Sequence, residues 1–147
     1  MVQLAPNPLT MGPVPSSPET VVLAANQAFY DAFAKADADA MARIWAREHM
    51  VACIHPGWVA LHGREAVVGS WRAILGSPEP PQVRASDAAA VIIGDAAFVT
   101  CVERIGQAEL AATNVFALEQ GEWRMVHHHA GPMSAERPSR RSPSPLN

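Results

Sequence analysis

Hydrophobic positions near the start of the chain recur at helical spacing. Val22, Phe29 and Phe33 lie seven and four residues apart, which places them on one face of a helix. Ser17 can accept the free amide hydrogens of the first turn, and Pro18 suits the first helical position. The pattern therefore predicts a helix that begins at Pro18 and ends near residue 35.

Two more helices are predicted before residue 77. Asp37 is placed to cap a short helix whose buried side includes Met41 and Ile44. Gly63 leads into a third helix with an apolar face of its own, and Gly76 ends that helix. All three helices precede the long strands.

The remaining segments follow the spacing of β-strands. Residues 50–55 are predicted to form a strand that the Pro56-Gly57 pair ends, and residues 58–62 a short edge element or loop. A proline-rich loop at residues 77–81 then precedes four longer strands separated by turns. These strands are predicted at residues 83–93, 96–105, 110–118 and 123–130.

Helices followed by an antiparallel meander predict an α+β domain over residues 17–133. A strongly bent sheet folded over the first helix would leave a cone open at one end, where a small organic molecule could bind. Residues 1–16 and 134–147 are rich in proline and lack periodicity. We therefore expect a disordered N-terminal arm and a disordered C-terminal tail.

Composition narrows the class of protein. The 147 residues suit one domain, and the net charge of −3 with no basic stripe excludes nucleic acid as a partner. The apolar runs are too short to span a membrane. No charged segment precedes an apolar run at the N-terminus, so we expect a cytoplasmic protein without a secretory signal. Cys53 and Cys101 lie in apolar strands, which favours buried, reduced thiols over a disulfide.

Four segments carry a resemblance to a known family. They are residues 29–37, 62–67, 94–99 and 121–127. On these segments the chain resembles the SnoaL-like domains of the nuclear transport factor 2-like (NTF2-like) superfamily, over about residues 18–132. The resemblance implies a cystatin-like α+β cone, with three N-terminal helices packed on a strongly curved, mainly antiparallel sheet. It also implies a homodimer formed through the convex face of that sheet.

Ketosteroid isomerases of this superfamily provide three positions for comparison. Their general base stands just before a proline at the end of the early strand, and His55 precedes Pro56 here. Their oxyanion-hole acid matches Asn114, and their tyrosine donor on the first helix matches Phe29, so that slot lacks a phenol. The resemblance thus implies His55 as base, Asn114 as oxyanion donor and Phe29 in the pocket wall. The residues alone leave alternatives open: His55 could bond a backbone carbonyl, and Asn114 could tie down a loop.

Three further residues are candidates for ligand binding. Comparison with the hub domains of calmodulin-dependent kinases implies that Glu103 lines the cavity, where it could orient His55 or bind a polar substrate. Otherwise Glu103 ends a strand in solvent. Trp58 follows a turn at the expected cone mouth and could touch a ligand. Arg64 could bind an anionic group or form a salt bridge with a carboxylate.

The last predicted strand carries three consecutive histidines. Strand alternation sends His127 and His129 to one face and His128 to the other. The hub comparison implies that His128 and Val126 face the cavity, although one bulge would reverse this. The outward pair could bind zinc with a third histidine, but no motif supports it, so we expect no metal site.

Together these features predict a small-molecule-binding protein. If it is an enzyme, the expected chemistry is cofactor-independent proton transfer, as in isomerisation, dehydration or cyclisation. The alternative is a non-catalytic ligand-binding or oligomerisation domain of the hub type. The apparent absence of a phenol and the few polar groups favour this alternative.

Overall fold

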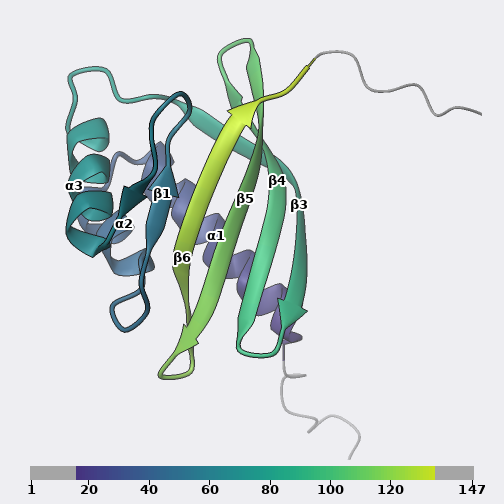
Figure 1. Cartoon of the computed structure of the whole chain (residues 1–147). Helices are drawn as coiled ribbons and strands as arrows, with labels where there is room; N and C mark the ends of the chain where they lie inside the picture. Colours follow the sequence, from purple (N-terminus) through teal and green to yellow (C-terminus); the bar gives the residue numbers. More distant parts are fainter. Residues whose placement is uncertain (1–15, 135–147) are drawn as a thin grey trace, which may run out of the picture.

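The computed structural model describes residues 16–134, which form three helices and one six-stranded sheet (Figure 1). The elements are α1 (Pro18–Ala34), α2 (Ala38–Ile44), β1 (Ala52–Ile54), β2 (Leu61–His62), α3 (Arg64–Leu75), β3 (Val83–Ile93), β4 (Ala96–Ile105), β5 (Ala108–Glu119) and β6 (Glu122–Pro132). The predicted α+β class is confirmed. The expected disordered arm and tail lie outside the described residues, apart from Ser16 and Ser134.

The sheet has the strand order β2-β1-β6-β5-β4-β3. β1 runs parallel to β6, and the other neighbours are antiparallel. Helix α1 crosses one face of the long strands, while α2 and α3 lie beside β1 (Figure 1). The register of β3 against β4 shifts between Ser86 and Ala89, where Asp87 has a φ of 55°. A bulge of this kind bends a strand and increases its twist.

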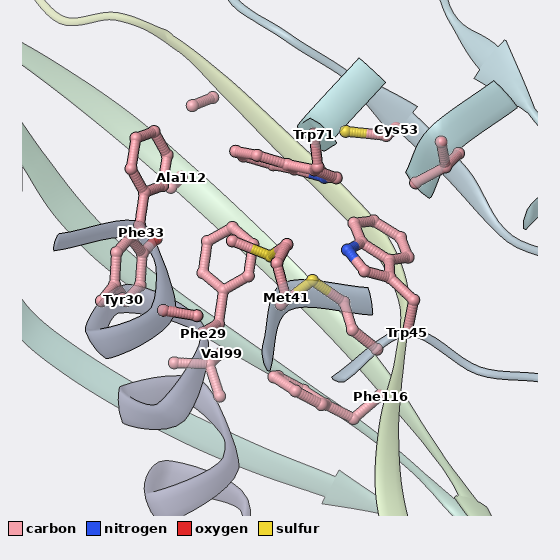
Figure 2. Packing of buried hydrophobic residues seen from close by; sticks show 14 of the residues in the cluster. Phe29, Tyr30, Phe33, Met41, Trp45, Cys53, Trp71, Val99, Ala112 and Phe116 are labelled. Atoms are coloured by element: carbon pink, nitrogen blue, oxygen red, sulfur yellow. The ribbon is translucent and has the colours of Figure 1, made fainter. Parts of the chain in front are cut away.

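Side chains from α1 and α3 fill the concave face. Phe29 and Phe33 meet Trp71 edge to face, with ring centroids 5.3 and 5.1 Å apart. Figure 2 shows these rings beside Trp45 and Phe116 in one continuous core. Because alanine occupies much of the chain, a few large side chains supply most of the buried apolar area. Edge-to-face ring pairs of this kind add about 0.5–1.5 kcal/mol beyond area burial.

Both cysteines are buried in this core and unpaired, as predicted. Burial, followed by the negative charge of Glu103, raises the pKa of the Cys53 thiol to about 12. Both effects disfavour the thiolate, so Cys53 behaves as a small apolar side chain. No helix in residues 16–134 is long and apolar enough to cross a membrane.

Arg64 holds the end of α2 in place and forms no salt bridge with a carboxylate of residues 16–134, whereas anion binding by Arg64 stays a prediction. Its guanidinium donates to the backbone carbonyls of Ala42 and Trp45 at 2.8 Å and of Ala46 at 3.2 Å. The last carbonyls of a helix have no partner within it, and an arginine satisfies them well. Arg64 thereby couples the start of α3 to the end of α2.

Glu119 anchors the loop that follows α2. Its carboxylate accepts the backbone N–H groups of Arg47, Glu48 and His49 at 2.8–2.9 Å, and it contacts the His49 ring at 2.8 Å. Burial alone would raise the pKa of Glu119, but these bonds, that of the Arg47 amide foremost, lower it to about 2. The charged carboxylate is therefore part of the folded state.

We predict that Glu119→Gln lowers the free energy of unfolding by about 1–3 kcal/mol at pH 7, because one amide oxygen replaces the carboxylate that serves these donors. Urea titration measures the change. Since the folded-state pKa is depressed, the contribution is complete above the ordinary value of 4.5 and is lost as the pH falls towards about 2. Glu122→Gln, at an exposed site, is the matched control. A variant as stable as wild type would contradict the anchoring role.

Candidate functional site

A cavity of about 230 Å³ opens among α1, α3, β4, β6 and the loop after β1. Its lining is largely aromatic and aliphatic. The lining residues are Phe33, His55, Pro56, Trp58, Trp71, Ile74, Pro81, Glu103, Ile105 and His128. Four of the predicted site residues, His55, Trp58, Glu103 and His128, therefore meet around one space.

His55 is held by a serine on α3, not by a backbone carbonyl, so that alternative prediction is wrong. Its Nε2 lies 2.8 Å from Ser70 Oγ, and this hydroxyl donates its single hydrogen to Val67 O at 2.7 Å. Ser70 must therefore accept a hydrogen from Nε2–H, which leaves Nδ1 as an acceptor, with Cys53 Sγ 4.0 Å from it. Burial lowers the pKa of His55 and favours this neutral form. His55 thus has one acceptor nitrogen, Nδ1.

Aromatic rings surround His55. The Trp58 ring lies 4.8 Å from the imidazole and the Trp71 ring 4.7 Å from it, both roughly edge to face. Trp71 is buried, whereas Trp58 is 49% exposed. Trp58 therefore stands at the rim of the cavity, where a ligand would enter.

Asn114 lies behind the cavity, in a fully buried network. Its amide nitrogen donates to Asn26 Oδ1 at 2.7 Å and to the Tyr30 hydroxyl at 3.1 Å, and its Oδ1 accepts from His128 Nδ1 at 2.5 Å. Both amide hydrogens are therefore occupied by side chains. An oxyanion contact from Asn114 would require one of these bonds to break, so its observed role is to position Tyr30 and His128.

A phenol lies one residue after the matched position and contacts a residue of the cavity wall without lining the cavity itself. Phe29, the matched position, is fully buried in the core and does not line the cavity. The next residue, Tyr30, donates its hydroxyl to Glu103 Oε1 at 2.7 Å and lies 3.2 Å from Cys101 Sγ. Burial and then Glu103 raise its pKa, so the phenol stays protonated. The sequence held one signal: Asn26 and Tyr30 lie four residues apart on one helix face.

Glu103 and His128 face each other at the inner end of the cavity, each about 2% exposed. His128 Nε2 lies 3.8 Å from Glu103 Oε1. Burial raises the pKa of Glu103, and the bond from Tyr30 offsets part of this rise. Burial, followed by the other histidines, lowers the pKa of His128 to about 3. His128 is therefore neutral, with its hydrogen on Nδ1 and a lone pair on Nε2.

The three consecutive histidines divide between the two faces of the sheet, as alternation predicts. His128 lines the cavity, whereas His127 and His129 lie on the opposite face. The prediction for Val126 is wrong, because the register between β5 and β6 shifts at this point. The extra residue leaves Val126 half-buried, and Met125, fully buried, takes the inward position.

The outward histidines have backbone and ring partners instead of a metal. His127 Nδ1 lies 3.0 Å from Ala52 O, and its ring lies edge to face with that of His129, with centroids 6.4 Å apart. Within residues 16–134, no three His, Cys, Asp or Glu side chains gather closely enough to hold a metal ion.

Comparison with known proteins agrees with this architecture. Residues 22–135 match the SnoaL-like domain family. The F-box protein SKIP8 of Arabidopsis thaliana is 28% identical over 114 residues, which are 76% of this chain and 49% of that protein. The chain thus spans about half the length of this curated relative.

Two solved structures share both fold and sequence. A proposed dehydratase of the NTF2-like family from Streptomyces avermitilis is 32% identical, with a TM-score of 0.71 over 79% of this chain and 96% of that one. A proposed association domain of calcium/calmodulin-dependent protein kinase type II from Thiobacillus denitrificans is 36% identical, with a TM-score of 0.65 over 84% and 100% of the two chains. The predicted resemblance is confirmed.

We predict that His128 keeps its neutral Nδ1–H form at pH 5, because burial opposes its charge. Nitrogen-15 NMR of the imidazole distinguishes both charge and tautomer. In urea-unfolded protein the same ring should titrate near 6.5. A folded-state His128 signal that moves between pH 8 and pH 5 would refute the assigned network. Because protonation is resisted in the fold, this group makes stability decrease as the pH falls below 6.5.

Proposed function

The chain belongs to the SnoaL-like domain family, and on this premise we propose that its cavity binds a small organic molecule and catalyses cofactor-independent proton transfer on it. The observation that carries the proposal is that His55, a neutral imidazole whose Nδ1 is an acceptor, lines a mostly apolar cavity. A neutral imidazole with a lowered pKa is a base at neutral pH, and its conjugate acid returns the proton readily.

The proposed step begins when His55 Nδ1 removes a proton from a carbon next to an electron-withdrawing group. The C–H electron pair becomes a new double bond. In an isomerisation the imidazolium returns the proton to a different carbon. In a dehydration the C–O bond breaks, and the leaving oxygen takes that proton and departs as water. Ser70 would hold the ring throughout, while Glu103 and His128 orient the ligand.

We predict that the protein exchanges an activated C–H hydrogen of a small ketone or β-hydroxy carbonyl compound with deuterium from the solvent. Proton NMR in D₂O follows this exchange without knowledge of the natural product. His55→Gln should reduce the rate by about 10²–10⁴-fold, because glutamine can still donate to Ser70 but has no basic nitrogen. His62→Gln, at an exposed histidine of β2, is the matched control. Exchange that persists in His55→Gln would exclude His55 as the base.

A second function, oligomerisation, is favoured by the outer face of the sheet. Two rows of side chains cross β3 to β6 on the face opposite α1. The rows are Val91, Phe98, Val115 and His127, and Ala89, Thr100, Thr113 and His129. Apart from histidine they carry no ionisable group, and small or β-branched side chains on sheets pack closely face to face. We propose that this face forms a homodimer, as an association domain would require.

We predict that Thr113→Arg converts the protein from dimer to monomer in light scattering, because it buries a charge at the centre of the proposed interface. Ala28→Arg, at an exposed position of α1, should leave the dimer intact. A wild-type protein that is strictly monomeric would refute the interface. A dimer that binds small molecules but shows neither hydrogen exchange nor water loss would favour the non-catalytic alternative.

A further inference from the structure

The two histidines and the glutamate that line the cavity present hydrogen-bond acceptors, and the indole N–H groups of Trp58 and Trp71 are donors in the same lining. The hydrogen on His55 Nε2 is given to Ser70, and the hydrogen on His128 Nδ1 is given to Asn114. Each neutral ring therefore keeps one lone pair. Glu103 adds a carboxyl group that already accepts a bond from Tyr30. None of the lining residues is a lysine or an arginine.

Aromatic faces form the walls around these acceptors. Trp58, Trp71 and Phe33 line the cavity together with the His55 ring. Neighbouring rings lie 4.7–5.1 Å apart at steep angles, so the aromatic residues of the lining pack against one another around the cavity. Tryptophan faces attract organic cations through the ring quadrupole.

We propose that the cavity accepts ligands that carry a small organic ammonium group, held by the faces of Trp58 and Trp71 and by the carboxylate of Glu103. This proposal deepens the proposed function and rests on the same cavity being the ligand site. An ammonium group beside the reacting carbon would also supply positive charge. The cavity walls lack such charge, and a developing carbanion needs it.

Other ligand classes fit these groups less well. An anion would be buried against lone pairs and a carboxyl group without any opposite charge, which is strongly unfavourable. A neutral ligand would gain no charge attraction from Glu103. Burial raises the pKa of Glu103, and a cation beside it would restore the charged form.

Three probes of matched shape test the proposal on the full chain by isothermal titration calorimetry. They are choline, its neutral carbon isostere 3,3-dimethyl-1-butanol, and the anion 3,3-dimethylbutanoate. We expect choline to bind at least tenfold more tightly than the alcohol, and the anion not to bind measurably. Equal or tighter binding of the alcohol, or no binding of choline, would overturn the proposal.

Variants locate the effect within the cavity. Glu103→Gln should weaken choline binding at least tenfold and change alcohol binding less than twofold, since glutamine can still accept the Tyr30 bond. Glu109→Gln removes the same charge from an exposed site on β5 and should change neither the choline affinity nor the alcohol affinity. Trp58→Leu should also weaken choline selectively. Unchanged choline affinity in Glu103→Gln would overturn the proposal, whereas failure of the proton-transfer function is judged separately by His55→Gln.

Discussion

The site depends on the complete hydrogen bonding of one buried amide. Asn114 has two donors and one acceptor, and all three are engaged inside the protein, by α1 through Asn26 and Tyr30 and by β6 through His128. An unpaired buried polar group costs about 1–3 kcal/mol, so each partner is confined to one position and one orientation. Because Asn114 is fully enclosed, no water can substitute for a missing partner.

The same matching of donors with acceptors determines the tautomers of the two histidines that line the cavity. Asn114 uses its oxygen for His128, so that ring must carry its hydrogen on Nδ1 and turn a lone pair towards Glu103. Ser70 gives its only hydrogen to a backbone carbonyl, so His55 must donate from Nε2 and keep Nδ1 basic. Two neutral imidazoles of opposite tautomer therefore follow from residues that do not line the cavity.

Sequence patterns predict which side chains share a helix or strand and one of its faces. They do not predict which residues distant in the sequence become the bonding partners of these side chains. The helices and strands, the reduced cysteines and the separation of His128 from its two neighbours followed from local spacing, whereas the inward direction of His128 came from the comparison with the hub domains. Tyr30 was missed because the family comparison pointed to Phe29, and periodicity does not distinguish adjacent buried rings. The predicted direction of Val126 was wrong because strict alternation along a strand does not reveal where a bulge inserts an extra residue. Arg64 binds carbonyls of another helix, a contact that only the tertiary fold creates.

Because side chains alternate along β6, adjacent residues of this strand belong to the cavity and to the proposed dimer face. His128 lines the cavity, while His127 and His129 belong to the proposed dimer face. Burial, followed by the nearby His55, His127 and His129, lowers the pKa of His128. Burial within the chain is the largest cause of the lowered pKa of His128, and a partner chain on the outer face would leave that burial unchanged. The cavity would therefore keep its neutral imidazole on dimerisation, so the proposed binding and the proposed assembly can operate independently on opposite faces of one sheet.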